Sequence, residues 1–104
     1  MESQKGFNRI STRYRKTLKA KYGLTVDQYM DMLEDQDYSC AICGKDDWGV
    51  RKPFVDHDHK TGEVRGLLCS TCNSGLGMFK DSKWLLLQAY NYLGKHNSRS
   101  KQDD

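Results

Sequence analysis

The spacing of apolar residues near the start of the chain predicts a helix over residues 11–22. Tyr14 and Leu18 lie four residues apart, which places them on one helical face beside basic residues. Gly23 follows, and glycine is the residue that most often ends a helix. We expect the residues before this helix to form an arm without regular structure.

A second helix is predicted from Thr25 to about residue 35. Thr25 with Gln28 three residues later has the pattern of a capping box, in which each side chain bonds the other residue's backbone. Asp27 lies in the first turn, where the helix dipole favours a negative charge. The apolar stripe of this helix consists of Val26, Tyr29, Met30 and Leu33. We expect this stripe to cover the cysteine-rich segment that follows.

The middle of the chain predicts a β-hairpin. Phe54 and Val55 form a short apolar run, and residues 64–68 form a second one. Residues 59–63 between them have turn composition, with Gly62 able to adopt a positive φ. The second strand leads directly to Cys69.

The last third of the chain predicts one short helix and one longer helix. Residues 73–78 contain two glycines, so any helix here should be short. Asp81 is expected to cap the longer helix and Gly94 to end it. Its apolar and aromatic residues include Trp84, Leu85, Leu87, Tyr90, Tyr92 and Leu93. The polar residues 95–104 are expected to be disordered.

Four cysteines are arranged as two Cys-x-x-Cys pairs, Cys40 with Cys43 and Cys69 with Cys72. A two-residue gap lets both thiolates of a pair reach one ion, and two pairs complete a tetrahedral zinc site. The first residues show no apolar signal segment, so a reducing compartment is expected, which favours zinc over disulfides or a redox pair. Such a site contributes on the order of 10 kcal/mol to the folding of small zinc domains. Trp48 is expected to fold over it rather than to stack on a base.

Length and charge narrow the possibilities further. A chain of 104 residues makes one domain with arms, and no stretch is long and apolar enough to span a membrane. The net charge of +3 is too small to indicate a nucleic-acid partner by itself. The basic residues gather near the start of the chain, at Lys5, Arg9, Arg13, Arg15, Lys16, Lys19 and Lys21. They could contact DNA phosphates or form a solvated face, and the charge alone does not separate the two.

The segment between the cysteine pairs carries the candidate chemistry. Asp56, His57, Asp58 and His59 follow one another there, and Asn73 comes directly after Cys72. Hydrolysis of a phosphodiester needs a hard divalent cation, for which Asp56 and Asn73 supply oxygen ligands. It also needs a base to activate water, a role for which the imidazole of His57 is suited. A second structural metal is the alternative, which the absence of further cysteines disfavours.

The strings VDHDHKTGEVRGLLCSTCN and CAIC, with KYGLTVDQY upstream, resemble the recombination endonuclease VII family of phage HNH nucleases. The resemblance covers roughly residues 22–93. It implies a ββα-metal fold, that is, a small zinc-stabilised α+β module with flanking helices. It also implies a Mg²⁺- or Mn²⁺-dependent endonuclease that nicks or cuts duplex or branched DNA.

The resemblance assigns roles to individual residues. Asp56 and Asn73 match the magnesium ligands, His57 the general base and His59 a second histidine near the phosphate. Arg65, in the VRGLLC stretch, would hold a phosphate or brace the hairpin. The zinc ligands would be Cys40, Cys43, Cys69 and Cys72. The residues expected to contact DNA are Arg13, Arg15, Lys16, Lys19 and Arg65.

Two departures limit what the resemblance implies. The best-known member has an acidic residue soon after the matching asparagine, whereas residues 74–77 contain none. A long C-terminal region that serves dimerisation and junction binding in that member is also not matched. The resemblance therefore implies cleavage chemistry more firmly than junction resolution, and homing, packaging and defence roles stay open.

These observations give the following expectations for the whole chain. Residues 1–38 form a basic arm with helices, residues 39–94 the zinc-bound nuclease core, and residues 95–104 the tail. The partner is DNA and not a membrane, with a homodimer or phage packaging or replication proteins left open. The location is cytoplasmic, in the host cell if the gene belongs to a phage. A non-catalytic zinc module that binds nucleic acid is the alternative function.

Overall fold

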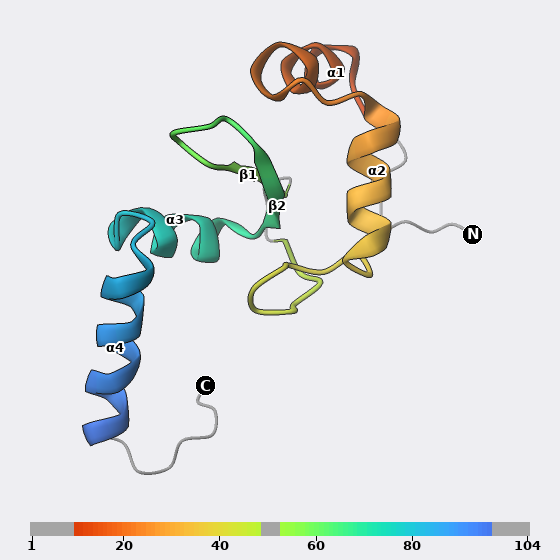
Figure 1. Ribbon diagram of the computed structural model, residues 1–104. Coiled ribbons are helices and arrows are strands. Elements are labelled where there is room, and N and C mark those ends of the chain that lie inside the picture. Colours follow the sequence, from red (N-terminus) through yellow and green to blue (C-terminus); the bar gives the residue numbers. More distant parts are fainter. Residues whose placement is uncertain (1–9, 49–52, 97–104) are drawn as a thin grey trace. The chain divides into compact units, whose positions relative to one another are not determined.

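The computed structural model describes residues 10–48 and 53–96 of the chain (Figure 1). Two compact units are present, Met1–Asn73 and Ser74–Asp104. The elements, in chain order, are α1 (Thr12–Thr17), a π-helical segment η1 (Leu18–Tyr22), α2 (Val26–Asp35), β1 (Phe54–His57), β2 (Val64–Leu68), α3 (Ser70–Met78) and α4 (Lys83–His96). The expected N-terminal arm with Lys5 and Arg9, and most of the expected tail, lie outside the described residues.

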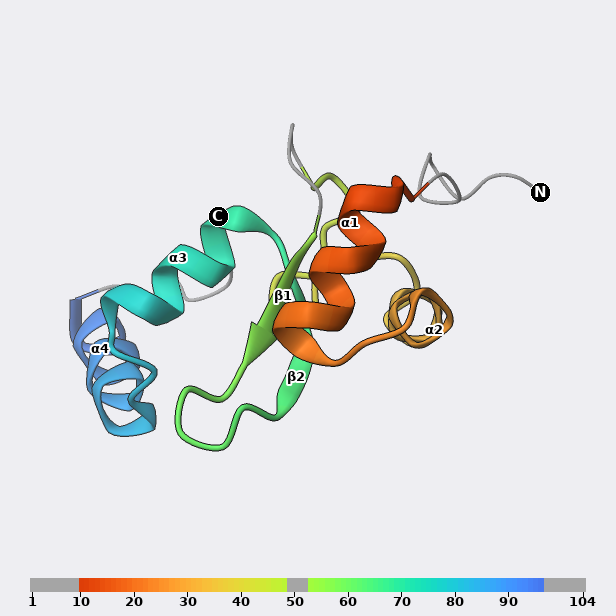
Figure 2. The same ribbon diagram turned by 90° about the horizontal axis from the view of Figure 1, so that it is seen from above.

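The predicted first helix is present over the expected residues, but its last turn is π-helical. The side chain of Ser11 caps α1 by accepting a hydrogen bond from the backbone N–H of Tyr14 at 3.0 Å. At the other end Gly23 adopts a φ of 70°, and its N–H donates to the carbonyl of Lys19 at 3.0 Å. Leu18, at the start of the π-helical turn, has no exposed surface. In Figure 2 α1 overlaps the hairpin in projection, and the ring contact between Tyr22 and His57 shows that η1 lies against β1.

The predicted capping box of the second helix is confirmed. The hydroxyl of Thr25 accepts from the N–H of Gln28 at 3.0 Å, and the Gln28 side chain accepts from the N–H of Thr25 at 2.9 Å. After α2 two consecutive residues, Asp37 and Tyr38, have φ values of 60° and 58°. This left-handed pair turns the chain sharply and leads it toward Cys40.

The predicted hairpin is also confirmed, and β1 extends further than the apolar run suggested. The two strands are antiparallel and pair Phe54 with Leu68 and Asp56 with Gly66. His57 then pairs with Val64, which leaves one extra residue, Arg65, in β2 as a bulge. Gly62 in the turn has a φ of 80°, as its position predicted.

The core of the first unit is formed by residues from the helices and from the hairpin. Leu18, Tyr29, Leu33 and Leu67 are almost completely buried, with exposures of 0 to 1%.

The described residues contain no helix long and apolar enough to cross a membrane.

The last third of the chain differs from its prediction in three places. The expected short helix is α3, which has nine residues and begins at Ser70, before Cys72. Ser82 rather than Asp81 caps α4, because the Ser82 hydroxyl accepts from the N–H of Leu85 at 3.0 Å. Asp81 instead has a φ of 57° in the preceding turn, and α4 runs through Gly94 to His96.

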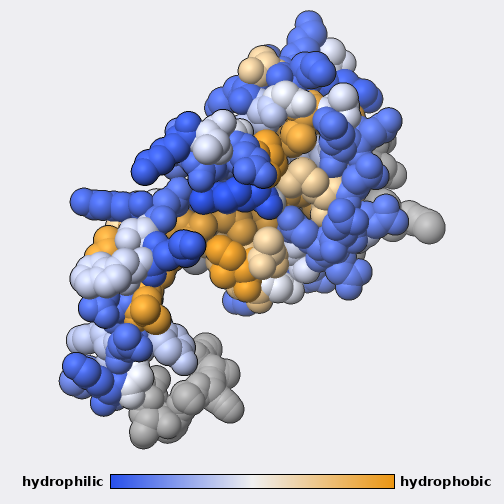
Figure 3. Space-filling view, viewed as in Figure 1, coloured by the Kyte–Doolittle hydropathy of each residue, from blue (hydrophilic) through white to orange (hydrophobic). Residues whose placement is uncertain are grey.

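Hydrophobic side chains lie at the surface of the second unit, as Figure 3 shows over α3 and α4. No described residue of either helix is buried. Six large apolar residues are more than half exposed: Met78, Trp84, Leu87, Tyr90, Tyr92 and Leu93.

Candidate functional site

The four cysteines meet in one cluster, although the two pairs are far apart in sequence. Their Sγ atoms all lie within 4.8 Å of one another, and none of the four forms a disulfide. The Sγ atoms of Cys43 and Cys69 are 3.9 Å apart. A tetrahedron with zinc–sulfur bonds of about 2.3 Å has edges of about 3.8 Å. The cluster could therefore hold a zinc ion.

Backbone N–H groups point at the sulfur atoms. Sγ of Cys40 accepts from the N–H groups of Ile42 and Cys69, both at 3.4 Å. Burial opposes ionisation of this thiol, but these N–H groups and hydrogen bonds from Cys43 outweigh it and lower the pKa of Cys40 to about 6. Burial and hydrogen bonds with the other cysteines raise the pKa of Cys72. Trp48 is 7% exposed and lines a pocket beside Cys43 and Cys69, in agreement with the expectation that it covers the cluster.

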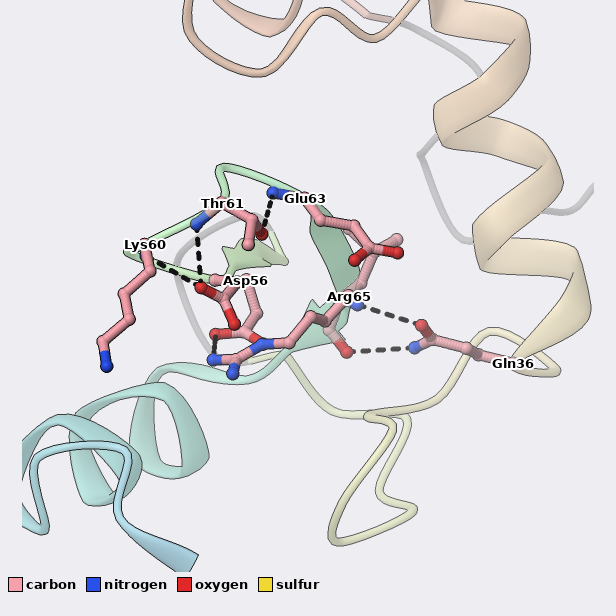
Figure 4. A network of polar contacts seen from close by, with 8 residues as sticks. Gln36, Asp56, Lys60, Thr61, Glu63 and Arg65 are labelled. Carbon is pink, nitrogen blue, oxygen red and sulfur yellow. Dashed lines mark hydrogen bonds and ion pairs between the residues drawn. The ribbon is translucent and has the colours of Figure 1, made fainter.

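Gln36, which the sequence analysis did not single out, joins α2 to the hairpin (Figure 4). Its amide accepts from the N–H of Leu67 at 2.9 Å and donates to the carbonyl of Leu67 at 3.0 Å. The same NH₂ group donates to the carbonyl of Ser39 at 2.9 Å. A Cβ at Gly66 would lie 3.3 Å from the Gln36 side-chain oxygen, so glycine makes room for this contact. Gln36 therefore holds β2 against the segment that leads to Cys40.

Asp56, near the end of β1, forms an ion pair with the extra residue of β2. Nε of Arg65 donates to one carboxylate oxygen of Asp56 at 2.7 Å, and a terminal nitrogen donates to the other at 3.0 Å. The Asp56 side chain is 13% exposed and the Arg65 side chain 38%. The resemblance offered two roles for Arg65, and its contact here is one that braces the hairpin.

His57 lies between two other rings. Its ring centroid is 5.6 Å from that of Tyr22, the last residue of η1, and 5.1 Å from that of His59. The imidazole of His57 is half-buried, whereas His59 is exposed. Tyr22 was not singled out from the sequence, although it lies in the string KYGLTVDQY and directly before the left-handed Gly23.

Asp58 has a different task from Asp56, although the two aspartates flank the same histidine. One of its carboxylate oxygens accepts from the N–H groups of Lys60 at 2.8 Å and Thr61 at 3.0 Å (Figure 4). These two N–H groups lower the pKa of Asp58. The carbonyl of Asp58 also accepts from the N–H of Gly62 at 2.7 Å. Asp58 thus shapes the hairpin turn.

Asn73 is fixed next to the cysteine cluster, because its N–H donates to the carbonyl of Cys69 at 2.9 Å within α3. Its side chain is half-buried, and its convergence with Asp56 stays a prediction. Four of the five residues that were expected to contact DNA are exposed on α1 and η1: Arg13, Arg15, Lys16 and Lys19. The fifth, Arg65, lies on β2 in the ion pair with Asp56.

Known proteins resemble this chain in sequence and in fold. A sequence model of the recombination endonuclease VII family matches residues 15–95. The chain belongs to the recombination endonuclease VII family. Two relatives of this family member are the gene 59 proteins of Mycobacterium phages D29 and L5, each 42% identical, over 88 and 86 residues. The matches cover 84% and 82% of this chain but 53% and 52% of the phage proteins.

A solved structure is also similar, the crystal structure of the ββα-Me type II restriction endonuclease Hpy99I. The TM-score is 0.54 at 30% identity, and the match covers 85% of this chain and 43% of that one. The predicted fold class, a small α+β module of ββα-metal type, is confirmed. This chain of the endonuclease VII family thus spans about half the length of the relatives it matches.

Proposed function

We propose that this chain is the nuclease module of a metal-dependent DNA endonuclease of the HNH type. Its chemistry would be hydrolysis of phosphodiester bonds in duplex or branched DNA. The observation that carries the proposal is the placement of Asp56 and His57 next to each other on β1. They lie at the bulged end of a hairpin that Gln36 and the cysteine cluster hold in place.

His57 is the group that would activate water. A neutral imidazole nitrogen can accept a proton from water at low energetic cost near neutral pH. The rings of Tyr22 and His59, with centroids 5.6 and 5.1 Å from that of His57, restrict how the imidazole can turn. A base with few accessible orientations needs less ordering when it reacts.

Asp56 and Asn73 are the residues that would hold a hard divalent cation. Carboxylate and amide oxygens suit Mg²⁺ and Mn²⁺, so the donor set fits. Both oxygens of Asp56 accept hydrogen bonds from Arg65, so the carboxylate is already oriented toward a positive charge. When bound, such a cation would act as a Lewis acid that stabilises negative charge on the phosphate.

The cysteine cluster and α1 would serve folding and DNA contact. Four thiolates form a closed zinc site, so Cys40, Cys43, Cys69 and Cys72 would hold structure rather than take part in cleavage. The exposed side chains of Arg13, Arg15, Lys16 and Lys19 suit phosphate contacts that position DNA without reading its sequence.

The test is a cleavage assay on supercoiled plasmid, linear duplex and a four-way junction, with the zinc-loaded chain and Mg²⁺ or Mn²⁺. Substitution of His57 by Ala should lower the cleavage rate by roughly 10²–10⁴-fold, because it removes a positioned proton acceptor. Raising the pH should restore part of the rate, since hydroxide then replaces the lost base. His59→Ala should have a milder effect.

His96→Ala is the matched control, since it removes a histidine at the end of α4 and should leave the rate unchanged. If His59→Ala is inactive while His57→Ala cuts at the wild-type rate, the base has been assigned to the wrong histidine. DNA binding without cleavage under every divalent cation would instead favour a non-catalytic zinc module.

A further inference from the structure

Arg65 and Asp56 make a two-point contact that a single point charge could not reproduce. The donor distances of 2.7 and 3.0 Å use both carboxylate oxygens of Asp56. Paired bonds of this kind between a guanidinium and a carboxylate are among the stronger polar contacts in proteins. The Asp56 side chain is only 13% exposed, so its charge is weakly screened by solvent.

The bulge explains how Arg65 reaches this carboxylate. Asp56 pairs with Gly66, so in a regular ladder the residue next to Gly66 would point to the opposite face from Asp56. Arg65 is the extra residue at this point, and a bulge re-aims the side chain that it carries. The bulge therefore brings the guanidinium of Arg65 onto the carboxylate of Asp56.

We propose that Arg65 and a divalent cation are alternative partners of Asp56. Resting on the function proposed above, this inference states that the guanidinium neutralises and orients the carboxylate until the cation replaces it. Both partners offer positive charge to the same two oxygens, and the two positive charges repel each other at that distance. Binding of the cation therefore has to weaken the ion pair.

The displaced guanidinium has a natural second partner at the same place. Arg65 is 38% exposed, and its planar fork matches two phosphate oxygens as well as two carboxylate oxygens. After displacement it would contact the phosphate that the cation also contacts. Arg65 would thus be a positioning residue for Asp56 in the free protein and a phosphate ligand in the complex with DNA.

The experiment measures Mn²⁺ binding to the zinc-loaded chain without DNA, by electron paramagnetic resonance of the free ion. Asp56→Asn should abolish binding at this site. Arg65→Gln removes the competing partner and should tighten Mn²⁺ binding roughly three- to tenfold, the range expected for a partly exposed paired contact. With DNA and saturating Mn²⁺, the same variant should cleave roughly tenfold more slowly or worse.

Lys60→Gln is the matched control. It also removes one positive charge from the hairpin, but Lys60 is exposed in the turn and its backbone N–H, not its side chain, bonds Asp58. Any change in Mn²⁺ affinity in Lys60→Gln measures the effect of removing a positive charge that does not contact Asp56. We expect this change to stay below about twofold. Should Arg65→Gln not fold, Arg65→Lys keeps the charge without the fork and should give a smaller tightening in the same direction.

The outcomes separate the inference from the function on which it rests. Wild-type Mn²⁺ binding by Asp56→Asn would refute the cation site itself. Loss of binding in Asp56→Asn, with Arg65→Gln no tighter than Lys60→Gln, would overturn the exchange alone. A purely structural role for Arg65 would lower the melting temperature and weaken binding and cleavage together, whereas the exchange moves binding and cleavage in opposite directions.

Discussion

Substitution of Gln36 by Ala should destabilise the hairpin and the cysteine cluster at the same time. The Gln36 amide makes three hydrogen bonds of 2.9 to 3.0 Å to the backbone of Leu67 and Ser39. Leu67 is completely buried, so water does not reach its backbone readily. Its carbonyl would keep a bond from the N–H of Ala41 at 3.2 Å, but its N–H would lose its acceptor.

These contacts set the size of the effect. A buried donor left without a partner costs about 1–3 kcal/mol, and each other lost bond about 0.5–1.5 kcal/mol. We therefore expect Gln36→Ala to lower the free energy of unfolding by about 2–6 kcal/mol, a large part of the 5–15 kcal/mol typical of a domain. Gln36→Glu should be at least as damaging at neutral pH, because a carboxylate cannot donate to the carbonyls of Ser39 and Leu67.

The assay is urea unfolding of the zinc-loaded protein, followed by circular dichroism. Gln88→Ala is the control, since Gln88 is exposed on α4 and alanine is a good helix former there. Zinc release to a chromogenic chelator gives a second measure, and it should be faster in Gln36→Ala because Ser39 precedes Cys40 and Leu67 lies two residues before Cys69. A loss below about 0.5 kcal/mol, equal to that of Gln88→Ala, would refute the reasoning.

Two further predictions concern the metal cluster and the basic helix. Zinc analysis should find about one ion per chain. Cys69→Ser should unfold the hairpin while part of the N-terminal helix stays folded, which circular dichroism would measure. A zinc-free protein with an unchanged melting temperature would contradict this. Replacing Arg13, Arg15, Lys16 and Lys19 by Gln should weaken DNA binding uniformly across sequences and reduce the number of counterions released on binding by up to about four. Titrations in 50 and 200 mM salt measure both effects, and an unchanged slope would leave these residues as a solvated face.

The elements of the first unit were predictable because each has a local cause. The capping box of Thr25 and Gln28 and the left-handed Gly23 and Gly62 act within a few residues, and the structure shows all of them. The cysteine spacing likewise predicted a cluster, because two-residue gaps constrain where thiolates can lie.

Features that depend on distant contacts were not predictable. Gln36 bonds Leu67 across 31 residues, and nothing near Gln36 in sequence marks it. Whether Asp56 or Asp58 shapes the turn depends on which carboxylate faces the N–H groups of Lys60 and Thr61. The start of α4 was misplaced for a related reason, because Asp81 and Ser82 are both good caps and only backbone conformation selects Ser82.

The bulge at Arg65 has a consequence for how the gene can tolerate changes of length. On the cysteine side of the bulge, pairing is anchored by the ladder from Phe54 to Asp56 and by Gln36. Loss of the single codon for Arg65 would join Val64 to Gly66 and regularise the ladder, so the reading frame and the hairpin could both survive. This deletion would nevertheless remove Arg65, the ion-pair partner of Asp56. A codon gained between residues 60 and 62 would disturb the turn around Asp58 but leave Asp56 and Arg65 paired, so two equally small indels would affect different properties of one hairpin.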